Sequence, residues 1–359
     1  MNGIDFLLKN AGVPIRYILT KDISLIPEYL ANSEVIEWLR RFKTWAEQYE
    51  WCGIGGIAHG DVHGSDDRRL MNIIGKCFIL GMNKDISEFD IIMKIYLSAL
   101  EKQVNKQLPE GNPAFWKMYE YRDYETYMAS YFPFMGYHDN ESVRYIADKR
   151  INYVYEFTKQ KRYDIYRSDA KYPGAKREWA AEIVDPALYS DGNIMLAEFY
   201  DYVLYAGIYN YVNEESRNKI ETIVEWIYDE DYSQIGRYYY YVPTDPSYKT
   251  KSINGKLWFT DLASPHITGS KCGLLFQCFI LSHFKASRNS IWFNEAIDFL
   301  NQYKLSDGLY QFPPDLILDK PDRHAWQGHL NAGENKKSKK YREIISTFWM
   351  ERIFANLTE

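Results

Sequence analysis

Residues that could carry out chemistry are concentrated in one short segment, GIAHGDVHG, in which His59, Asp61 and His63 stand between glycines. Two imidazoles four residues apart can hold a divalent metal ion on a helix, and a carboxylate can orient an imidazole as an acid or a base. The interleaved glycines disfavour a helix here, and the sequence offers no identifiable third metal ligand. Three interpretations stay open: acid or base groups of a substrate pocket, a metal site, and a polar loop. We take the three residues as catalytic candidates.

Asp66 and Asp67 follow this segment directly. Acidic side chains are common just before a helix, where a carboxylate accepts hydrogen bonds from free backbone N–H groups. We therefore expect this pair to cap a helix that begins near Arg68.

A second acidic and imidazole pair, Asp261 and His266, lies in WFTDLASPHITGSK before an apolar run that starts at Cys272. A carboxylate that fixes and charges an imidazole makes an oriented acid or base. The alternative is local, with the aspartate in a turn and the histidine in a loop. Both residues join the catalytic candidates.

Loops rich in Gly, Pro, Asp and Tyr supply candidates for substrate binding. The chain has 32 tyrosines and 10 tryptophans, and aromatic faces stack on sugars and hold cations. A strongly AT-rich genome would explain the tyrosine excess equally well. The binding candidates are Asp191, Tyr239, Trp258, Asp307, Tyr310 and Trp326, and further aromatic and imidazole groups stand at Tyr238–Tyr241, His324 and His329.

Composition limits the class of protein. The 359 residues carry a formal charge of -6 and are 46% hydrophobic, which suits one large or two small globular domains, and we expect a single domain over residues 1–359. No stretch approaches the roughly 18 apolar residues of a membrane span or has the pattern of a secretion signal, so we expect a cytoplasmic protein without membrane insertion. The only basic run, NKKSKKYR, fits a solvated loop, and no nucleic-acid partner is expected.

The four cysteines show no CxxC spacing and lie mostly in apolar stretches. A disulfide framework or a structural zinc site is therefore not expected, and buried thiols are. The sequence predicts no cofactor, and a divalent metal at the histidine pair stays an alternative.

Helical periodicity dominates the chain, and strand signals are scarce. Apolar residues recur at three- and four-residue steps in Ser33–Tyr49, Asp85–Gln107, Glu141–Gln160, Glu214–Tyr228 and Asn289–Tyr303. A short polar turn precedes each of these segments, near Asn32, Asn83, Asp139, Asn213 and Arg288, and a long loop follows each. The pattern predicts five helical hairpins whose long loops gather on one face, because structureless loops beyond about 15 residues are uncommon unless functional.

The first and last apolar helices, GIDFLLKN and EIISTFWMERIF, each lack a partner. If they pair, the array closes into a ring of six hairpins, an all-α fold. This layout resembles the α/α-toroid superfamily, which includes terpenoid cyclases, protein prenyltransferase β subunits and, more distantly, (α/α)6 glycoside hydrolases and lyases. Two short segments, SDGLYQFP and TGSKCGLLFQ, are similar to the segments that lead into the inner helices of toroid proteins. A plain multi-helix bundle is the alternative.

The catalytic motifs of these families are not intact. The acid run DxDD has its nearest equivalent at Asp229-Glu230-Asp231-Tyr232, which departs at the last position, and the DDxxD pattern fails at the fifth residue of Asp66-Asp67-Arg68-Arg69-Leu70. The prenyltransferase zinc set is absent. No spacing selects the carboxylate pair that a glycoside hydrolase needs.

The sequence therefore favours an enzyme that binds a small apolar or cyclic metabolite in an aromatic funnel. It would act by acid–base catalysis, in a terpenoid-type cyclisation or isomerisation. The alternatives are a carbohydrate-active (α/α)6 hydrolase or lyase and a noncatalytic toroid that binds a ligand or peptide. The oligomeric state is left open.

Overall fold

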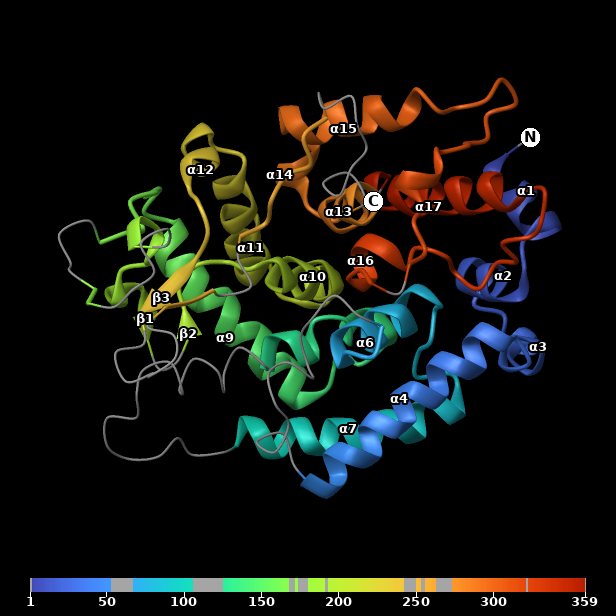
Figure 1. Cartoon of the computed structure of the whole chain (residues 1–359), viewed down its shortest axis with the longest axis horizontal. Coiled ribbons are helices and arrows are strands. Elements are labelled where there is room, and N and C mark those ends of the chain that lie inside the picture. The colour runs from blue at the N-terminus through green and yellow to red at the C-terminus, as the bar shows by residue number, and fades with distance from the viewer. Residues whose placement is uncertain are drawn as a thin grey trace. The chain divides into compact units, whose positions relative to one another are not determined.

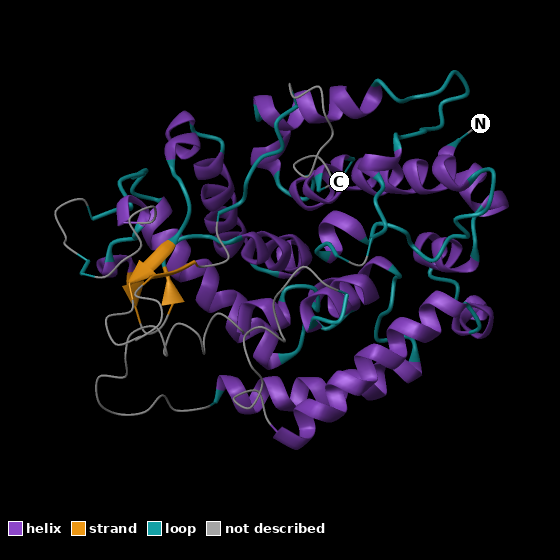
Figure 2. Cartoon of the chain, viewed as in Figure 1, coloured by secondary structure: helices purple, strands orange, loops and turns teal. Residues whose placement is uncertain are grey.

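The structure is a computed structural model that describes residues 2–52, 67–105, 125–167, 172–173, 180–190, 193–241, 250–252, 256–262, 273–320 and 322–358. It is mostly helical, which confirms the predicted all-α class (Figure 2). Strand structure among these residues is confined to two short antiparallel pairs. Contacts along the chain group into two compact units, unit 1 (Met1–Glu101, Phe134–Tyr137, Phe259–Glu359) and unit 2 (Lys102–Pro133, His138–Trp258).

Unit 1 is built from helices at both ends of the chain. Its α-helices are α1 (Gly3–Asn10), α2 (Val13–Thr20), α3 (Ile26–Leu30), α4 (Ser33–Cys52), α6 (Leu70–Ile79), α7 (Ser87–Val104), α13 (Leu274–Leu281), α14 (Lys285–Arg288), α15 (Ile291–Asn301), α16 (Ala325–Gly328) and α17 (Tyr341–Leu357) (Figure 1). Short 3-10 helices stand at Ile23–Leu25, Pro133–Met135 and Pro314–Leu316.

Unit 2 combines α-helices with the two strand pairs. The helices are α9 (Glu141–Thr158), α10 (Phe199–Ile208), α11 (Glu214–Ile227) and the short α12 (Glu230–Gln234), with 3-10 helices at Ala180–Glu182, Pro186–Leu188 and Tyr209–Tyr211. Strand β1 (Tyr189–Ser190) pairs with β2 (Asn193–Ile194), and β3 (Tyr239–Tyr241) pairs with β4 (Thr250–Ser252). A further helical segment covers residues 125–129.

The five periodic segments of the sequence form the predicted helices α4, α7, α9, α11 and α15. Their starts are fixed by polar side chains of the preceding short turns: Asn32, Asn140, Asn213 and Ser290 each accept a hydrogen bond from a backbone N–H of the first helical turn. Such caps satisfy N–H groups that have no partner within the helix. Each of these helices buries one face and exposes the other.

The helices that precede α7, α11 and α15 in their hairpins are buried on all sides. All ten residues of α6, all ten of α10 and all eight of α13 are buried. A helix that is apolar all round must be covered on every side, whereas an amphipathic helix has to be covered on one face. Fully buried and half-exposed helices therefore alternate along the chain, α6 with α7, α10 with α11 and α13 with α15.

The first and last helices of the chain pack together in unit 1, as Figure 1 also shows. The approach is close at Gly3, where a Cβ atom would stand 3.1 Å from Thr347 Cγ2. Helix α1 also contacts α2, and α17 contacts α13, so the two terminal helices are neighbours within one continuous core. The pairing that the sequence left conditional is present, and closure into one ring of six hairpins stays a prediction.

Two of the four cysteines have described side chains. Cys77 in α6 and Cys278 in α13 are free and fully buried, and burial raises the pKa of both thiols. The prediction of buried thiols is confirmed for these two. The side chains of Cys52 and Cys272 lie outside the described residues.

Candidate functional site

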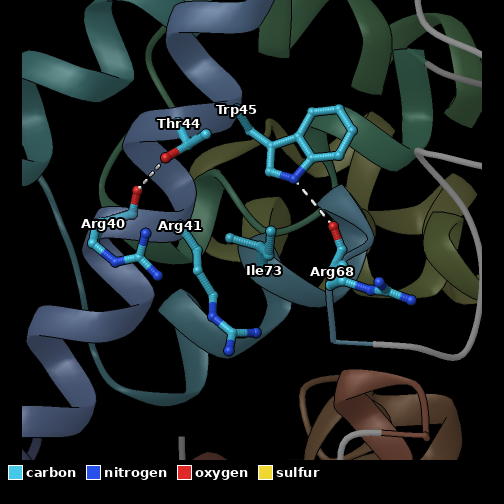
Figure 3. A pocket seen from close by; sticks show the side chains of 6 residues that line it. All are labelled: Arg40, Arg41, Thr44, Trp45, Arg68 and Ile73. Carbon is cyan, nitrogen blue, oxygen red and sulfur yellow. Dashed lines mark hydrogen bonds between the residues drawn. The ribbon is translucent and has the colours of Figure 1, made fainter.

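A cavity of about 280 Å³ lies between α4 and the start of α6 in unit 1 (Figure 3). Three arginines contribute to its walls together with one aromatic, one aliphatic and one hydroxyl side chain. We call it the arginine pocket, and its lining residues are Arg40, Arg41, Thr44, Trp45, Arg68 and Ile73. None of these six side chains is acidic, so the pocket combines positive charge with apolar surface.

Helical spacing explains how α4 supplies most of the wall. Residues four apart on a helix lie on the same face, and Arg40 with Thr44 and Arg41 with Trp45 are two such pairs. The Thr44 hydroxyl donates to the Arg40 carbonyl oxygen at 3.0 Å, and the Trp45 indole N–H donates to the Arg68 carbonyl oxygen at 3.1 Å. The second bond ties the chain before α6 to α4 and fixes the mouth of the pocket (Figure 3).

Two carboxylates hold the arginine side chains in place. Arg40 donates hydrogen bonds to the Glu37 carboxylate from Nε at 3.1 Å and from Nη2 at 3.0 Å, and Arg41 Nε donates to the same carboxylate at 2.8 Å. The hydrogen bond from Arg41 is the main reason that the pKa of Glu37 is lowered. Arg41 also donates to Asp67 Oδ2 at 2.8 Å and lies over the Trp38 ring at 4.7 Å. These contacts orient Arg40 and Arg41 on the α4 side of the pocket.

The bond from Arg41 corrects the expected role of Asp67. Helix α6 begins at Leu70, its N-cap is Arg69, and no side chain caps it by a hydrogen bond. Asp67 is instead an ion-pair partner of α4, because the Arg41 guanidinium reaches it before the helix starts. Asp66 lies outside the described residues.

A buried histidine stands behind the pocket in the same unit. The ring of His329 meets Trp38 edge-on with centroids 5.5 Å apart, and its Nδ1 lies 3.8 Å from Asp319 Oδ1. Its Nε2 is buried and has no hydrogen-bond partner among the described residues. Burial is the main cause that lowers the pKa of His329 to about 4, Lys76 lowers it further, and Asp319 and Asp67 oppose the shift. The imidazole is therefore neutral at pH 7, and it is a weaker base than an exposed histidine.

A buried ammonium fixes the segment that carries this histidine. Lys76 in α6 is fully buried, and its Nζ donates to the carbonyl oxygens of His329 at 3.2 Å and Asn331 at 2.5 Å. The third contact is an ion pair with Glu34 Oε1 of α4 at 2.7 Å. All three ammonium protons are used, so Lys76 serves as an anchor and not as a reactive amine.

Five of the eleven candidates from the sequence lie outside the described residues: His59, Asp61, His63, Asp191 and His266. Two more are in unit 2. Tyr239 is buried in β3, and Trp258 is half exposed with the Lys256 ammonium 4.2 Å from its ring centroid. Within the run RYYYYV, the adjacent Tyr238 and Tyr239 are both buried.

The remaining four candidates are in unit 1, and none of them lines the arginine pocket. Asp261 is exposed, and Asp307 is an exposed turn residue whose carboxylate accepts from the Leu309 N–H at 3.1 Å. Tyr310 is buried and donates to Asn301 Oδ1 at 2.8 Å. Trp326 stacks on His324 at a centroid distance of 6.0 Å, in the same segment as His329.

The pocket itself was not anticipated from the sequence. The signal that could have found it is the repeated pairing of arginine with Trp and Thr at helical spacing in RRFKTW, followed by the arginines of DDRRL. Of the pocket network, the sequence singled out His329, Asp67 and Arg68, in other roles. Among the described residues no group of three His, Cys, Asp or Glu side chains is placed to hold a metal ion, and no described helix has the length and hydropathy of a membrane span.

Comparisons with known proteins identify no relative: no family model, no curated protein and no solved structure matches this chain.

Proposed function

We propose that this chain is an enzyme of the α/α-toroid type whose arginine pocket binds the anionic group of a small metabolite with an apolar body. The observation that carries the proposal is the composition of the pocket lining, which contains three arginines, Trp45 and Ile73 and no acidic residue. Guanidinium groups recognise carboxylate and phosphate oxygens through paired N–H donors.

The size of the pocket favours a small ligand. A volume of about 280 Å³ is near the lower end of the roughly 300–1,000 Å³ of small-molecule sites. An indole face and a branched aliphatic side chain suit a hydrocarbon or ring system. A phosphate or diphosphate ester of an apolar alcohol has both parts, which agrees with the substrate class expected from the sequence.

Acid–base chemistry has two supports close to this pocket. The segment that carries His59, Asp61 and His63 ends directly before Asp67 and Arg68 in the sequence, so the chain brings those candidates to within a few residues of the pocket wall. His329 is a second candidate base, neutral at pH 7 and connected to the pocket through Trp38 and Arg41. We propose that one of these groups transfers a proton to or from the bound substrate.

The toroid part of the proposal rests on the alternation of buried and half-exposed helices and on the packing of α1 against α17. In such a ring the starts of the buried helices face the long loops. The arginine pocket lies at the start of α6, which is where a toroid would place its substrate.

A thermal-shift titration tests the proposal. The ligands are geranyl diphosphate, inorganic pyrophosphate, geraniol and a neutral oligosaccharide, which separate the anionic group from the apolar body. Geranyl diphosphate is expected to raise the melting temperature most, pyrophosphate less, and geraniol and the oligosaccharide not at all, because a ligand stabilises the folded state by mass action.

Three variants locate the binding. Arg40→Gln and Arg68→Gln are each expected to weaken binding of geranyl diphosphate about tenfold, the value of one charge-assisted hydrogen bond. The matched control is Lys43→Gln, which removes a cation from the same helix outside the pocket. Equal binding by all three variants would reject the arginine pocket as the site.

A further inference from the structure

Arg352 of α17 is surrounded by aromatic rings in unit 1. Its guanidinium carbon lies 4.1 Å from the ring centroid of Phe279, 5.2 Å from those of Phe78 and Trp349, and 5.6 Å from that of Phe348. We call these four rings the aromatic cage. Ring faces attract a cation, so the cage stabilises the positive charge of the guanidinium without using its N–H groups.

The N–H donors of Arg352 are unused. Among the described residues Arg352 forms no ion pair within 4.0 Å and donates no hydrogen bond, and its Nη1 is buried without a partner. Arg150 of α9 shows the usual outcome for a buried arginine, since it donates to Asp201 and to the carbonyl oxygens of Ile194 and Leu196. A guanidinium carries five N–H donors, and leaving a buried one without an acceptor is costly.

Positive charge also exceeds negative charge around the cage. Lys21 at the end of α2 is exposed by surface area, and its pKa is lowered first by the protein atoms that surround its ammonium group and then by the charge of Arg352. Burial lowers the pKa of His283, and Arg352 and Arg288 lower it further. Among the described residues, the Asp85 carboxylate raises the pKa of Lys21, and no ion pair within 4.0 Å joins the two. Burial lowers the pKa of Arg352 to about 9, which leaves it charged at pH 7.

We propose that Arg352 is the anchor of a second anion-binding site in unit 1 that accepts a carboxylate or phosphate group. The planar guanidinium fork matches two oxygens of either group, and the aromatic cage holds the fork in place from its faces. Arg352 as a whole is half-buried, so part of its side chain is exposed to solvent. This site shares no residue with the arginine pocket and does not depend on the function proposed for it.

Calorimetric titration of the full chain with inorganic phosphate and with benzoate tests the proposal. The variants are Arg352→Lys, which keeps the charge and loses the fork, Arg352→Gln, which loses both, and Lys21→Gln, which alters an exposed residue. Binding at the Arg352 site is expected in the unsubstituted chain, about tenfold weaker in Arg352→Lys, absent in Arg352→Gln and several-fold weaker in Lys21→Gln. Arg68→Gln is the control for the other site: it is expected to weaken a second binding event at the arginine pocket and to leave binding at the Arg352 site unchanged.

Two results would overturn the proposal. One is that neither anion binds at millimolar concentration. The other is binding that Arg68→Gln abolishes and that the Arg352 and Lys21 variants leave unchanged, because the anion would then occupy the arginine pocket. If Arg352→Gln does not fold, Arg352→Lys and Lys21→Gln decide the outcome. Failure of geranyl diphosphate to bind would remove the proposed function and leave this inference standing.

Discussion

At the scale of single residues, the buried His329 predicts how the stability of the fold depends on pH. The imidazole is buried, and its pKa of about 4 lies below the value near 6.5 of an unfolded chain. Between those two values the unfolded state binds a proton that the folded state does not. The free energy of unfolding is therefore expected to fall as the pH drops from 6.5 toward 4, by up to about 3 kcal/mol from this group, and to be unaffected by it above pH 6.5.

Urea unfolding of the unsubstituted chain and of His329→Gln checks this prediction at pH 7.0, 6.0 and 5.0. The variant lacks the titrating group, so its stability should depend less steeply on pH over this interval, whatever its absolute stability. Identical slopes for the two proteins would mean that His329 titrates normally in the folded state.

Single residues also mark the limit of sequence reasoning. His329 was visible as a residue type that could do chemistry, and its surroundings depend on Asp319 and on Trp38 from a distant part of the chain. Arg68 was named only as the expected start of a helix, and its place in the pocket depends on Trp45 of α4. Tyr239 and Tyr310 were expected to face a ligand, and both are buried, one in a paired strand and one hydrogen-bonded to Asn301. A tyrosine in a Gly- and Pro-rich segment has the same sequence signal in either position.

At the scale of elements, Arg150 and Asp201 join α9 to α10 in unit 2. Asp201 is fully buried, accepts two hydrogen bonds from Arg150 at 2.7 and 2.8 Å, and also accepts from the Glu198 N–H at 2.8 Å. Asp201→Asn keeps the shape and leaves a buried guanidinium without its counter-charge. We expect it to lower the free energy of unfolding by about 3–5 kcal/mol, the usual cost of breaking a buried ion pair.

The matched control is Asp164→Asn. Asp164 accepts from two nitrogens of Arg162 at 3.0 Å in a pair that is largely exposed, and exposed pairs contribute about 0–1 kcal/mol. Urea unfolding of both variants gives the comparison. A similar small effect in the two would show that the α9–α10 ion pair does not hold unit 2 together.

Elements were the level at which the sequence was most informative. The helices α4, α7, α9, α11 and α15 were predicted within a few residues of their ends because each has an apolar face and begins after a polar turn. The short helix α16 and the strand β3 were not predicted, since neither is long enough to show a period. The start of α6 was misjudged because Asp67 pairs with Arg41 and not with the helix.

At the scale of the whole molecule, the buried helices should be its most stable parts. Helices α6, α10 and α13 are covered on all sides, whereas α15 exposes one face. Local opening of a surface helix requires less apolar surface to be exposed. Hydrogen exchange followed by mass spectrometry should therefore show slower exchange in α13 than in its hairpin partner α15. Faster exchange in α13 than in α15 would contradict the view that the fully buried helices are the most stable parts of the molecule.

Closure of the helices into a ring is a property of the whole molecule that the sequence suggested but did not establish. Apolar terminal helices predicted a pairing, and α1 does pack on α17. The shared direction of the long loops stays a prediction, because parts of those loops lie outside the described residues. The proposed enzyme function depends on them for His59, Asp61 and His63.

The most direct test of the central claim is a crystal structure of the chain grown with geranyl diphosphate. The account predicts diphosphate oxygens within hydrogen-bond distance of the Arg40 and Arg68 guanidinium groups, and the hydrocarbon against Trp45 and Ile73. Diphosphate bound elsewhere with the arginine pocket empty would contradict it.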